Sequence, residues 1–179
     1  MIDTTLPDFA SLSRNRFLLI LMVLLLLRIR SIASGNRLVI ALVNLFGTLL
    51  HETAHFLVGL ALNAQPTGLS LWPRRQTDGR LSLGSVTLRN LRFYNTLPTA
   101  LAPLLLLAPA WWVDQHFFDH WPRTVAHLLL QVVLITLLLD NALPSTTDVR
   151  VAVRNIGGLL FYGALLGGGW WVWRNGLVL

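Results

Sequence analysis

Residues 51–55 read His-Glu-Thr-Ala-His, a run whose residue types and spacing suit metal-dependent hydrolysis. Because residues four apart share one face of an α-helix, the imidazoles of His51 and His55 can converge on one ion. Zinc suits two neutral imidazoles with a carboxylate, and it then keeps a fourth position for water. Glu52, the only Glu in the chain, stands beside the first histidine. We therefore predict a zinc site in which Glu52 is the general base that takes the proton of the activated water.

The third protein ligand is expected among the aspartates. Asp148 is the best candidate, because it follows Asn141 and Pro144 in a loop just before the last apolar segment. An alternative is that Asp148 is the N-cap of the final helix, since Asp is a favoured residue at helix N-termini. Asp140 is the alternative ligand. The predicted set is therefore the two histidines of the motif together with Asp148.

The composition places this motif in an apolar setting. Hydrophobic residues make up 54% of the 179 residues and charged residues only 12%, and the charges cluster between long apolar stretches. This pattern is typical of a polytopic membrane protein. An ionised side chain at the centre of a membrane helix costs at least about 2.5–3.5 kcal/mol, so one that is kept there is usually functional. The alternative is that the motif only forms interhelical hydrogen bonds.

Five apolar segments are predicted to be helices, and we expect them to form a single membrane domain over residues 1–179. The first is short for a bilayer, so it either spans with its flanking arginines reaching the interface or lies half-inserted. The second carries the histidines. The segments are 17–30, 38–64, 97–113, 124–140 and 156–173. The predicted fold is an all-α integral membrane bundle of about four to five transmembrane helices.

Residues 66–92 differ from the helical segments and are predicted to form a small β-hairpin. Leucines and valines alternate with polar residues there, and Asp78-Gly79 is a strong turn signal. An exposed hairpin edge can receive an unwound peptide by strand addition, with Leu83 and Val86 as the candidate contacts. The alternative is that the segment is an interfacial connector.

The other unusual features of the apolar segments have simpler interpretations. Pro98, Pro103 and Pro109 fall in the third helix, where proline is tolerated if neighbouring groups satisfy the freed carbonyls. Residues 114–123 are predicted to be a polar turn flanked by tryptophans at the membrane interface. His116 and His120 lie in it, and an interfacial turn is favoured over a second metal site.

Charge suggests how the helices are oriented. All 14 basic residues are Arg, the net charge is +6, and the arginines flank apolar segments, which favours lipid headgroups over nucleic acid as their partner. If all five helices span, the side of the hairpin carries nine arginines and the opposite side five. The positive-inside rule then predicts an integral protein of a bacterial inner membrane with its active site toward the cytoplasm.

The sequence resembles the site-2 protease family of intramembrane zinc metalloproteases. The matching features are the His-Glu-Thr-Ala-His run in an early helix, the hairpin-like stretch, and Asn141-Ala142-Leu143-Pro144 leading to Asp148. The family's second motif has a gap one residue longer and ends Leu-Asp-Gly, whereas Val149 follows the aspartate here. The resemblance covers roughly residues 38–173 and is to a short, divergent branch without accessory domains.

The resemblance implies hydrolysis of peptide bonds in or near transmembrane segments, with Zn²⁺ as cofactor and a membrane protein as substrate. Asn141 would orient the substrate or hydrogen-bond the oxyanion. The alternative is that Asn141 has only a structural role in a turn. The alternative function is a catalytically inactive zinc-binding membrane protein that serves as an assembly or regulatory partner. A metal transporter ranks last. It would need a polar path across the bilayer, and the only polar residues within 38–50 are Asn44 and Thr48.

Overall fold

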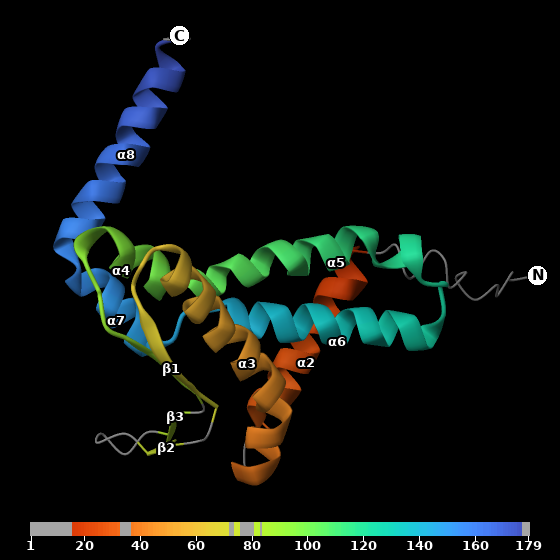
Figure 1. Ribbon diagram of the computed structural model, residues 1–179. Coiled ribbons are helices and arrows are strands. Elements are labelled where there is room, and N and C mark those ends of the chain that lie inside the picture. The colour runs from red at the N-terminus through yellow and green to blue at the C-terminus, as the bar shows by residue number, and fades with distance from the viewer. Residues whose placement is uncertain (1–15, 33–36, 72–73, 76–80, 83, 177–179) are drawn as a thin grey trace, which may run out of the picture. The chain divides into compact units, whose positions relative to one another are not determined.

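The computed structural model describes residues 16–32, 37–71, 74–75, 81–82 and 84–176, and this part of the chain is mostly helical (Figure 1). Its elements are α2 (Arg16–Ile32), α3 (Arg37–Ala61), β1 (Pro66–Ser70), β2 (Arg74–Arg75), β3 (Leu81–Ser82), β4 (Ser85–Leu88), α4 (Phe93–Ala100), the 3-10 helix η1 (Ala102–Leu106), α5 (Leu107–His120), α6 (Val125–Ala142), α7 (Thr146–Arg154) and α8 (Ile156–Arg174). The chain divides into a first unit, residues 1–47 and 105–142, and a second unit, residues 48–104 and 143–179.

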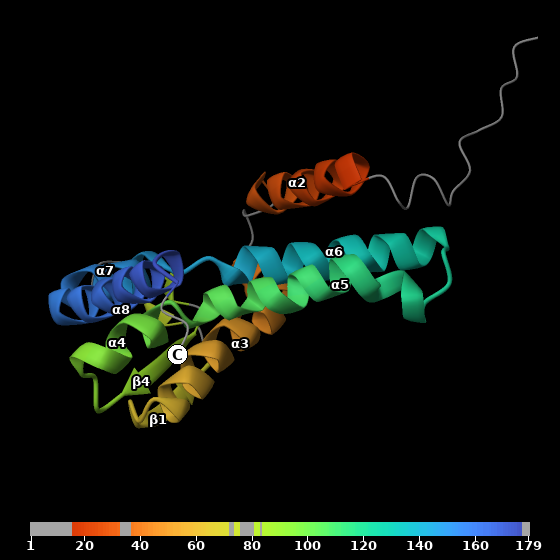
Figure 2. The same cartoon turned by 90° about the horizontal axis from the view of Figure 1, so that it is seen from above.

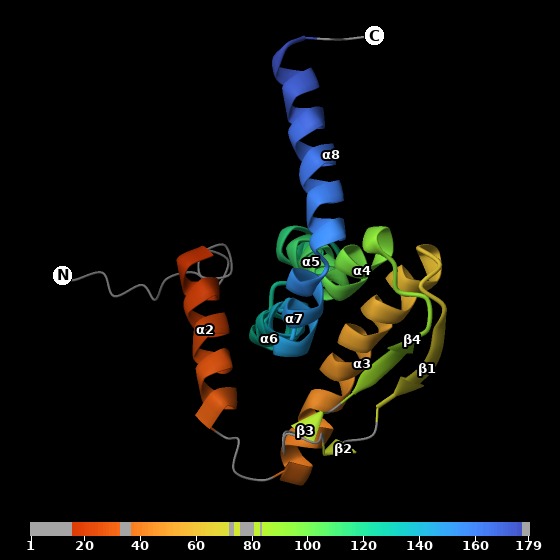
Figure 3. The same cartoon turned by 90° about the vertical axis from the view of Figure 1, so that its left-hand side faces the viewer.

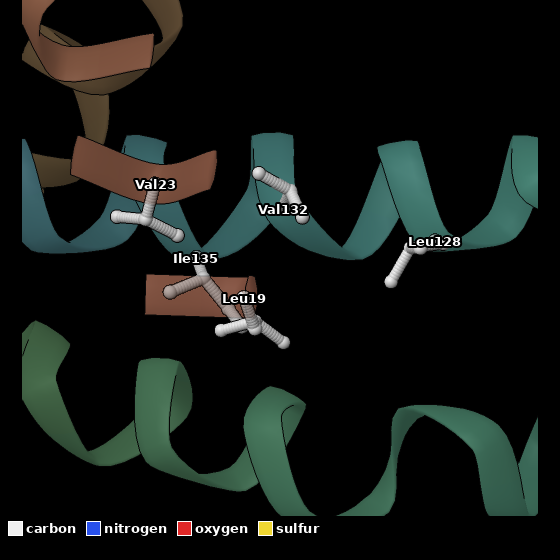
Figure 4. Close-up of a cluster of buried hydrophobic side chains, with 5 residues drawn as sticks. All are labelled: Leu19, Val23, Leu128, Val132 and Ile135. Carbon is white, nitrogen blue, oxygen red and sulfur yellow. The ribbon is translucent and has the colours of Figure 1, made fainter. Parts of the chain in front are cut away.

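The first unit has its core between α2 and α6. Apolar side chains spaced three or four residues apart line one face of each helix, as expected for helices that pack together. The buried cluster in Figure 4 consists of Leu19, Val23, Leu128, Val132 and Ile135. The predicted helix at residues 17–30 is therefore confirmed as a helix, and one of its faces is buried in protein.

Helix α5 lies beside α6 in the same unit (Figure 2). The predicted polar turn at residues 114–123 is wrong for its first seven residues, because α5 continues through His120. Asp114 forms an ion pair with Arg16 of α2, and the ring of His116 stacks on Trp112 one turn earlier. These contacts support a helical conformation at residues that polarity alone assigns to a turn.

The predicted helix 97–113 is divided in the structure. Helix α4 begins four residues earlier, at Phe93, and ends at Ala100, after which η1 leads into α5. Pro103 explains the interruption, because a proline inside a helix removes one backbone hydrogen bond and its ring clashes with the preceding turn.

The predicted β-structure is confirmed as two short antiparallel pairs in the second unit. Strand β1 pairs with β4, with Leu69 opposite Val86, and β2 pairs with β3. Strand β4 runs beside the C-terminal part of α3 (Figure 3). A Cβ added at Gly84 would contact Glu52, and one added at Gly59 would contact Leu88, so the two elements run in the same direction. The predicted turn at Asp78-Gly79 and Leu83 lie outside the described residues.

Asn95 joins the end of α3 to the start of α4. Its side chain is fully buried, and its amide nitrogen donates to the carbonyls of Leu62 and Asn90. Its amide oxygen accepts the backbone N–H of Arg92 at 2.7 Å. Because each of these groups would be costly to bury unpaired, Asn95 fixes how the two helices meet.

Helices α7 and α8 complete the second unit. The predicted loop that holds Asp148, before the last apolar segment, is wrong for most of its length, because α7 occupies nine residues there and packs against α4. Two side chains beyond α7 then bond carbonyls of α4. The Asn155 amide donates to the carbonyl of Phe93 at 2.9 Å, and the Tyr162 hydroxyl donates to that of Tyr94. Helix α4 therefore contacts both α7 and α8.

Two helices in the described part of the chain, α6 and α8, are long and apolar enough to cross a membrane. Helix α4 together with residues 102–120 could make a third span. Most of α8 is exposed, including Leu166 and Trp173. Exposed apolar side chains along a helix of this length suit contact with lipid. Membrane association is therefore possible, whereas a bundle of four to five spanning helices stays a prediction.

Candidate metal centre

The two histidines of the motif lie one turn apart on α3 and face the same point. Their Nε2 atoms are 3.3 Å apart, and the two rings meet edge to face with centroids 4.9 Å apart. Helical spacing alone brings them to one face. The proximity of the two Nε2 atoms means that both rings also adopt orientations directed at a common position.

Asp148 completes a group of three donors with these histidines. Its Oδ2 lies 3.4 Å from the Nε2 of His51, and its Oδ1 lies 3.4 Å from the Nε2 of His55. The three residues form the only group of this kind among the described residues, and they could hold a metal ion. All three belong to the second unit. The structure thus brings together residues that stand 97 positions apart in the sequence.

A backbone carbonyl fixes the protonation of His55. The ring is buried, and its Nδ1 lies 2.7 Å from the carbonyl oxygen of Thr99 in α4. A carbonyl only accepts, so Nδ1 must carry the hydrogen. The Nε2 atom of the neutral ring then presents a lone pair to His51 and Asp148, as metal binding requires.

Asp148 is held at the N-terminus of α7 by a reciprocal capping interaction. Its carboxylate accepts the backbone N–H of Ser145 at 2.7 Å, and the Ser145 hydroxyl accepts the backbone N–H of Asp148 at 3.2 Å. The carboxylate therefore takes part in the cap of α7 and also faces the histidines, whereas the N-cap of the final helix α8 is Asn155 and not Asp148. Asp148 is the third residue of α7 and not the N-cap itself.

The charge of Asp148 suits a ligand. Burial by itself would raise the pKa of this carboxyl, but the nearby imidazoles of His51 and His55 and the hydrogen bond with Ser145 outweigh burial and lower the pKa below its usual range. Asp148 is therefore ionised at neutral pH, and no proton has to be displaced before it can bind a cation.

Glu52 lies next to the group and is buried, with 9% of its surface exposed. It is close enough to interact electrostatically with His51, His55 and Asp148. Gly84, just before β4, covers its side chain: a Cβ at Gly84 would lie 2.7 Å from Cγ of Glu52. The backbone at residue 84 can approach this closely because glycine has no side chain.

The other predicted site residues are not brought into this group. Asn141 belongs to the first unit, where its amide packs against Gly47 and donates to the carbonyl of Leu137. Asp140, the alternative ligand, is also in the first unit and is not a member of the group. Val86 is half-buried in β4, opposite Leu69 of β1. Substrate contacts of these residues stay predictions.

The remaining histidines make local contacts. The Nδ1 atoms of His116 and His120 approach carbonyls one turn earlier on α5, and both rings contact Trp112. The Nδ1 of His127 lies 2.8 Å from the hydroxyl of Thr124 at the start of α6. None of these three belongs to a metal-binding group among the described residues.

Three groups that shape the site were missed by sequence reasoning: the Thr99 carbonyl, Asn95 and Gly84. A backbone carbonyl has no residue-type signature, so no motif could identify Thr99. Asn95 is an ordinary polar residue in sequence, and its role depends on partners at the end of α3. The sequence does hold one signal for the Thr99 carbonyl: Pro103 stands four residues later and has no N–H to donate to it.

Comparison with known proteins adds no further assignment. No known protein family, curated protein or solved structure matches the chain.

Proposed function

We propose that the chain is an intramembrane zinc metalloprotease that hydrolyses peptide bonds in or near transmembrane segments of membrane proteins. The observation that carries the proposal is the spacing of the three donors. Two ligand atoms 2.0–2.1 Å from a tetrahedral zinc lie about 3.3–3.4 Å apart. The two Nε2 atoms are 3.3 Å apart, and each lies 3.4 Å from a different oxygen of the Asp148 carboxylate, so the group comes close to the spacing of a zinc site.

Three protein ligands leave one tetrahedral position for water or substrate, which is the arrangement of catalytic zinc sites. Zinc, when bound, would lower the pKa of water at that position and polarise the peptide carbonyl. Glu52 would accept the proton of that water at a carboxylate oxygen and pass it to the leaving amine. Its burial beside the ligands, in the second unit with all three of them, supports this role.

Two further features support a substrate from the membrane. The apolar, exposed surfaces of α6 and α8 suit a chain that lies among lipids. Strand β4 runs beside the part of α3 that carries Glu52, and a substrate must be extended before a protease can reach its carbonyls. Strand addition at this β-structure, with Leu83 and Val86 as contacts, would present such an extended segment.

Substituting Glu52 tests this proposal. Glu52→Gln keeps the size of the side chain but cannot accept a proton, so hydrolysis of a transmembrane substrate should fall about 10²–10⁴-fold. Zinc content should stay at the wild-type level, because all three ligands remain. The measurements are cleavage of a membrane-spanning reporter peptide in detergent or liposomes and metal content of the same preparations.

The result also decides between an enzyme and an inactive zinc-binding partner protein. The partner protein would be favoured if the wild type bound zinc but cleaved no membrane reporter, and if Glu52→Gln behaved like the wild type. Loss of zinc in Glu52→Gln would instead mean that the glutamate belongs to the ligand set.

A further inference from the structure

Pro98 and Pro103 lie near the end of α4. Four residues before each of them, a backbone carbonyl accepts a hydrogen bond from a side chain of another helix. Pro98 follows Tyr94, whose carbonyl accepts the hydroxyl of Tyr162 of α8. Pro103 follows Thr99, whose carbonyl is 2.7 Å from the Nδ1 of His55. In an uninterrupted α-helix the residue four positions later supplies the N–H for such a carbonyl. Proline has no N–H, so neither proline can supply it.

We propose that Pro103 is a positioning residue for the metal centre: by withholding an N–H from the Thr99 carbonyl, which the N–H of Leu101 also approaches, it leaves room on that carbonyl for the Nδ1–H of His55. The proposal rests on the zinc site proposed above, because it concerns one of its ligands. Pro103 acts through Thr99 and His55 and does not touch the ion. Helix α4 ends at Ala100 and η1 begins at Ala102, so the regular hydrogen-bond ladder stops at this point.

The bond matters because a neutral imidazole carries its single hydrogen on one of two nitrogens. With the hydrogen on Nδ1, the Nε2 of His55 faces His51 and Asp148 with its lone pair. With the hydrogen on Nε2, the same ring would direct a donor into the site and could not bind a cation there. Partners of this kind typically change metal affinity by about 10–100-fold when they are lost.

Burial makes the carbonyl an effective partner. Thr99 is 1% exposed and His55 is 7% exposed, so water cannot easily replace either member of the bond. Asn95, one turn earlier on α4, holds the same helix to the end of α3. The distance between the Thr99 carbonyl and His55 is therefore set by the packing of two helices, and Pro103 keeps a further N–H from competing for that carbonyl.

The test compares Pro103→Ala with two controls in the full-length protein. Pro103→Ala adds an N–H at the position from which it can bond the Thr99 carbonyl. Pro98→Ala adds an N–H to the same helix but opposite the Tyr94 carbonyl, away from His55. The third protein carries 2-hydroxypropanoic acid at position 103, which has the side chain of alanine and an ester oxygen in place of the N–H.

Two quantities are measured in detergent. The first is the hydrogen position on His55 in metal-free protein, from nitrogen-15 spectra of histidine-labelled samples with His55→Gln to assign the signal. The second is zinc affinity by chelator competition. We expect Pro103→Ala to lose the single Nδ1–H form and to bind zinc about tenfold or more weakly. Pro98→Ala and the ester protein should resemble the wild type in both measurements.

Each other outcome overturns the proposal. A wild-type spectrum and zinc affinity in Pro103→Ala would show that the added N–H does not reach the Thr99 carbonyl. An equal defect in Pro98→Ala or in the ester protein would assign the effect to general packing or to the proline ring. If the wild type bound no zinc, the proposed function would fail, while the metal-free spectra would still decide the role of Pro103.

Discussion

At the scale of single residues, Asp148 combines two tasks that usually fall to different side chains. Its carboxylate accepts the N–H of Ser145 at the start of α7, and its oxygens also lie 3.4 Å from the Nε2 atoms of His51 and His55. The cap fixes the rotamer of the carboxylate before any ion binds, which reduces the entropy cost of forming the site. The short helix α7, whose N-cap Ser145 lies three residues earlier, is therefore part of the way this carboxylate is presented.

The two tasks of Asp148 can be separated by substitution. Asp148→Asn keeps an oxygen that can accept the Ser145 N–H but removes the charge, so zinc binding should fall sharply while thermal stability of the metal-free protein changes little. Ser145→Ala removes the hydroxyl of the cap, which should cost about 1 kcal/mol of stability and leave one zinc per chain. Chelator competition and thermal unfolding measure the two effects. Full zinc affinity in Asp148→Asn would remove the residue from the ligand set.

Sequence reasoning was strongest for these side chains because their chemistry depends on residue type. His51 and His55 follow from helical spacing, and Asp148 follows from its place before the last apolar segment. The capping role was considered only as an alternative to binding, since a sequence pattern does not show that one carboxylate can face two partners. The Thr99 carbonyl was out of reach, because any residue type can supply a carbonyl.

At the scale of elements, the approach of β4 to α3 is the feature that bears most directly on Glu52. The chain just before β4 lies so close that a Cβ at Gly84 would come 2.7 Å from both Glu52 and Thr48. This glycine has no positive φ, so space and not backbone conformation requires it. The sequence predicted a hairpin here but gave no information about which face of α3 it would cover.

Gly84→Ala should therefore impair catalysis more than metal binding. The added methyl group would displace the Glu52 side chain, and a shift of about 1 Å in a catalytic group can cost about 10²-fold in rate. Gly68→Ala in the paired strand β1 is the control, because its Cβ would meet only the Thr87 hydroxyl, at 3.9 Å. Cleavage rates and zinc content of both variants are compared. Equal rates in the two variants would show that the close approach at Gly84 has no catalytic consequence.

The elements also show where polarity and length mislead. The polar residues 114–120 are helical because they make contacts within the first unit, and those contacts cannot be seen in a linear sequence. The segment around Pro144 and Asp148 was predicted to be a loop, yet Ser145 starts a helix there through its cap. Apolar runs identified the existence of the helices well, whereas their ends depended on caps and prolines.

At the scale of the whole molecule, the orientation in a membrane is still a prediction. Helix α6 offers a direct test, because it is long and apolar enough to span and has exposed residues at each end. The chain has no cysteine, so single-cysteine variants can be made without removing native thiols. Pro122→Cys lies before α6, and Leu143→Cys lies after it.

In intact inner-membrane vesicles or cells, a membrane-impermeant thiol reagent should label only one of these two cysteines from a given side. The nine-to-five arginine count predicts that position 143 faces the cytoplasm and position 122 the opposite side. Permeabilised membranes serve as the control, since both positions should then react. Labelling of both positions from the same side of an intact membrane would show that α6 does not span it.

The account depends most on the claim that His51, His55 and Asp148 bind one zinc ion, and X-ray absorption at the zinc edge of purified wild-type protein tests it most directly. The account predicts about one zinc per chain, with four ligands at about 2.0–2.1 Å and the outer-shell scattering of two imidazoles. Protein without zinc, or zinc surrounded by six oxygens with no imidazole scattering, would contradict it.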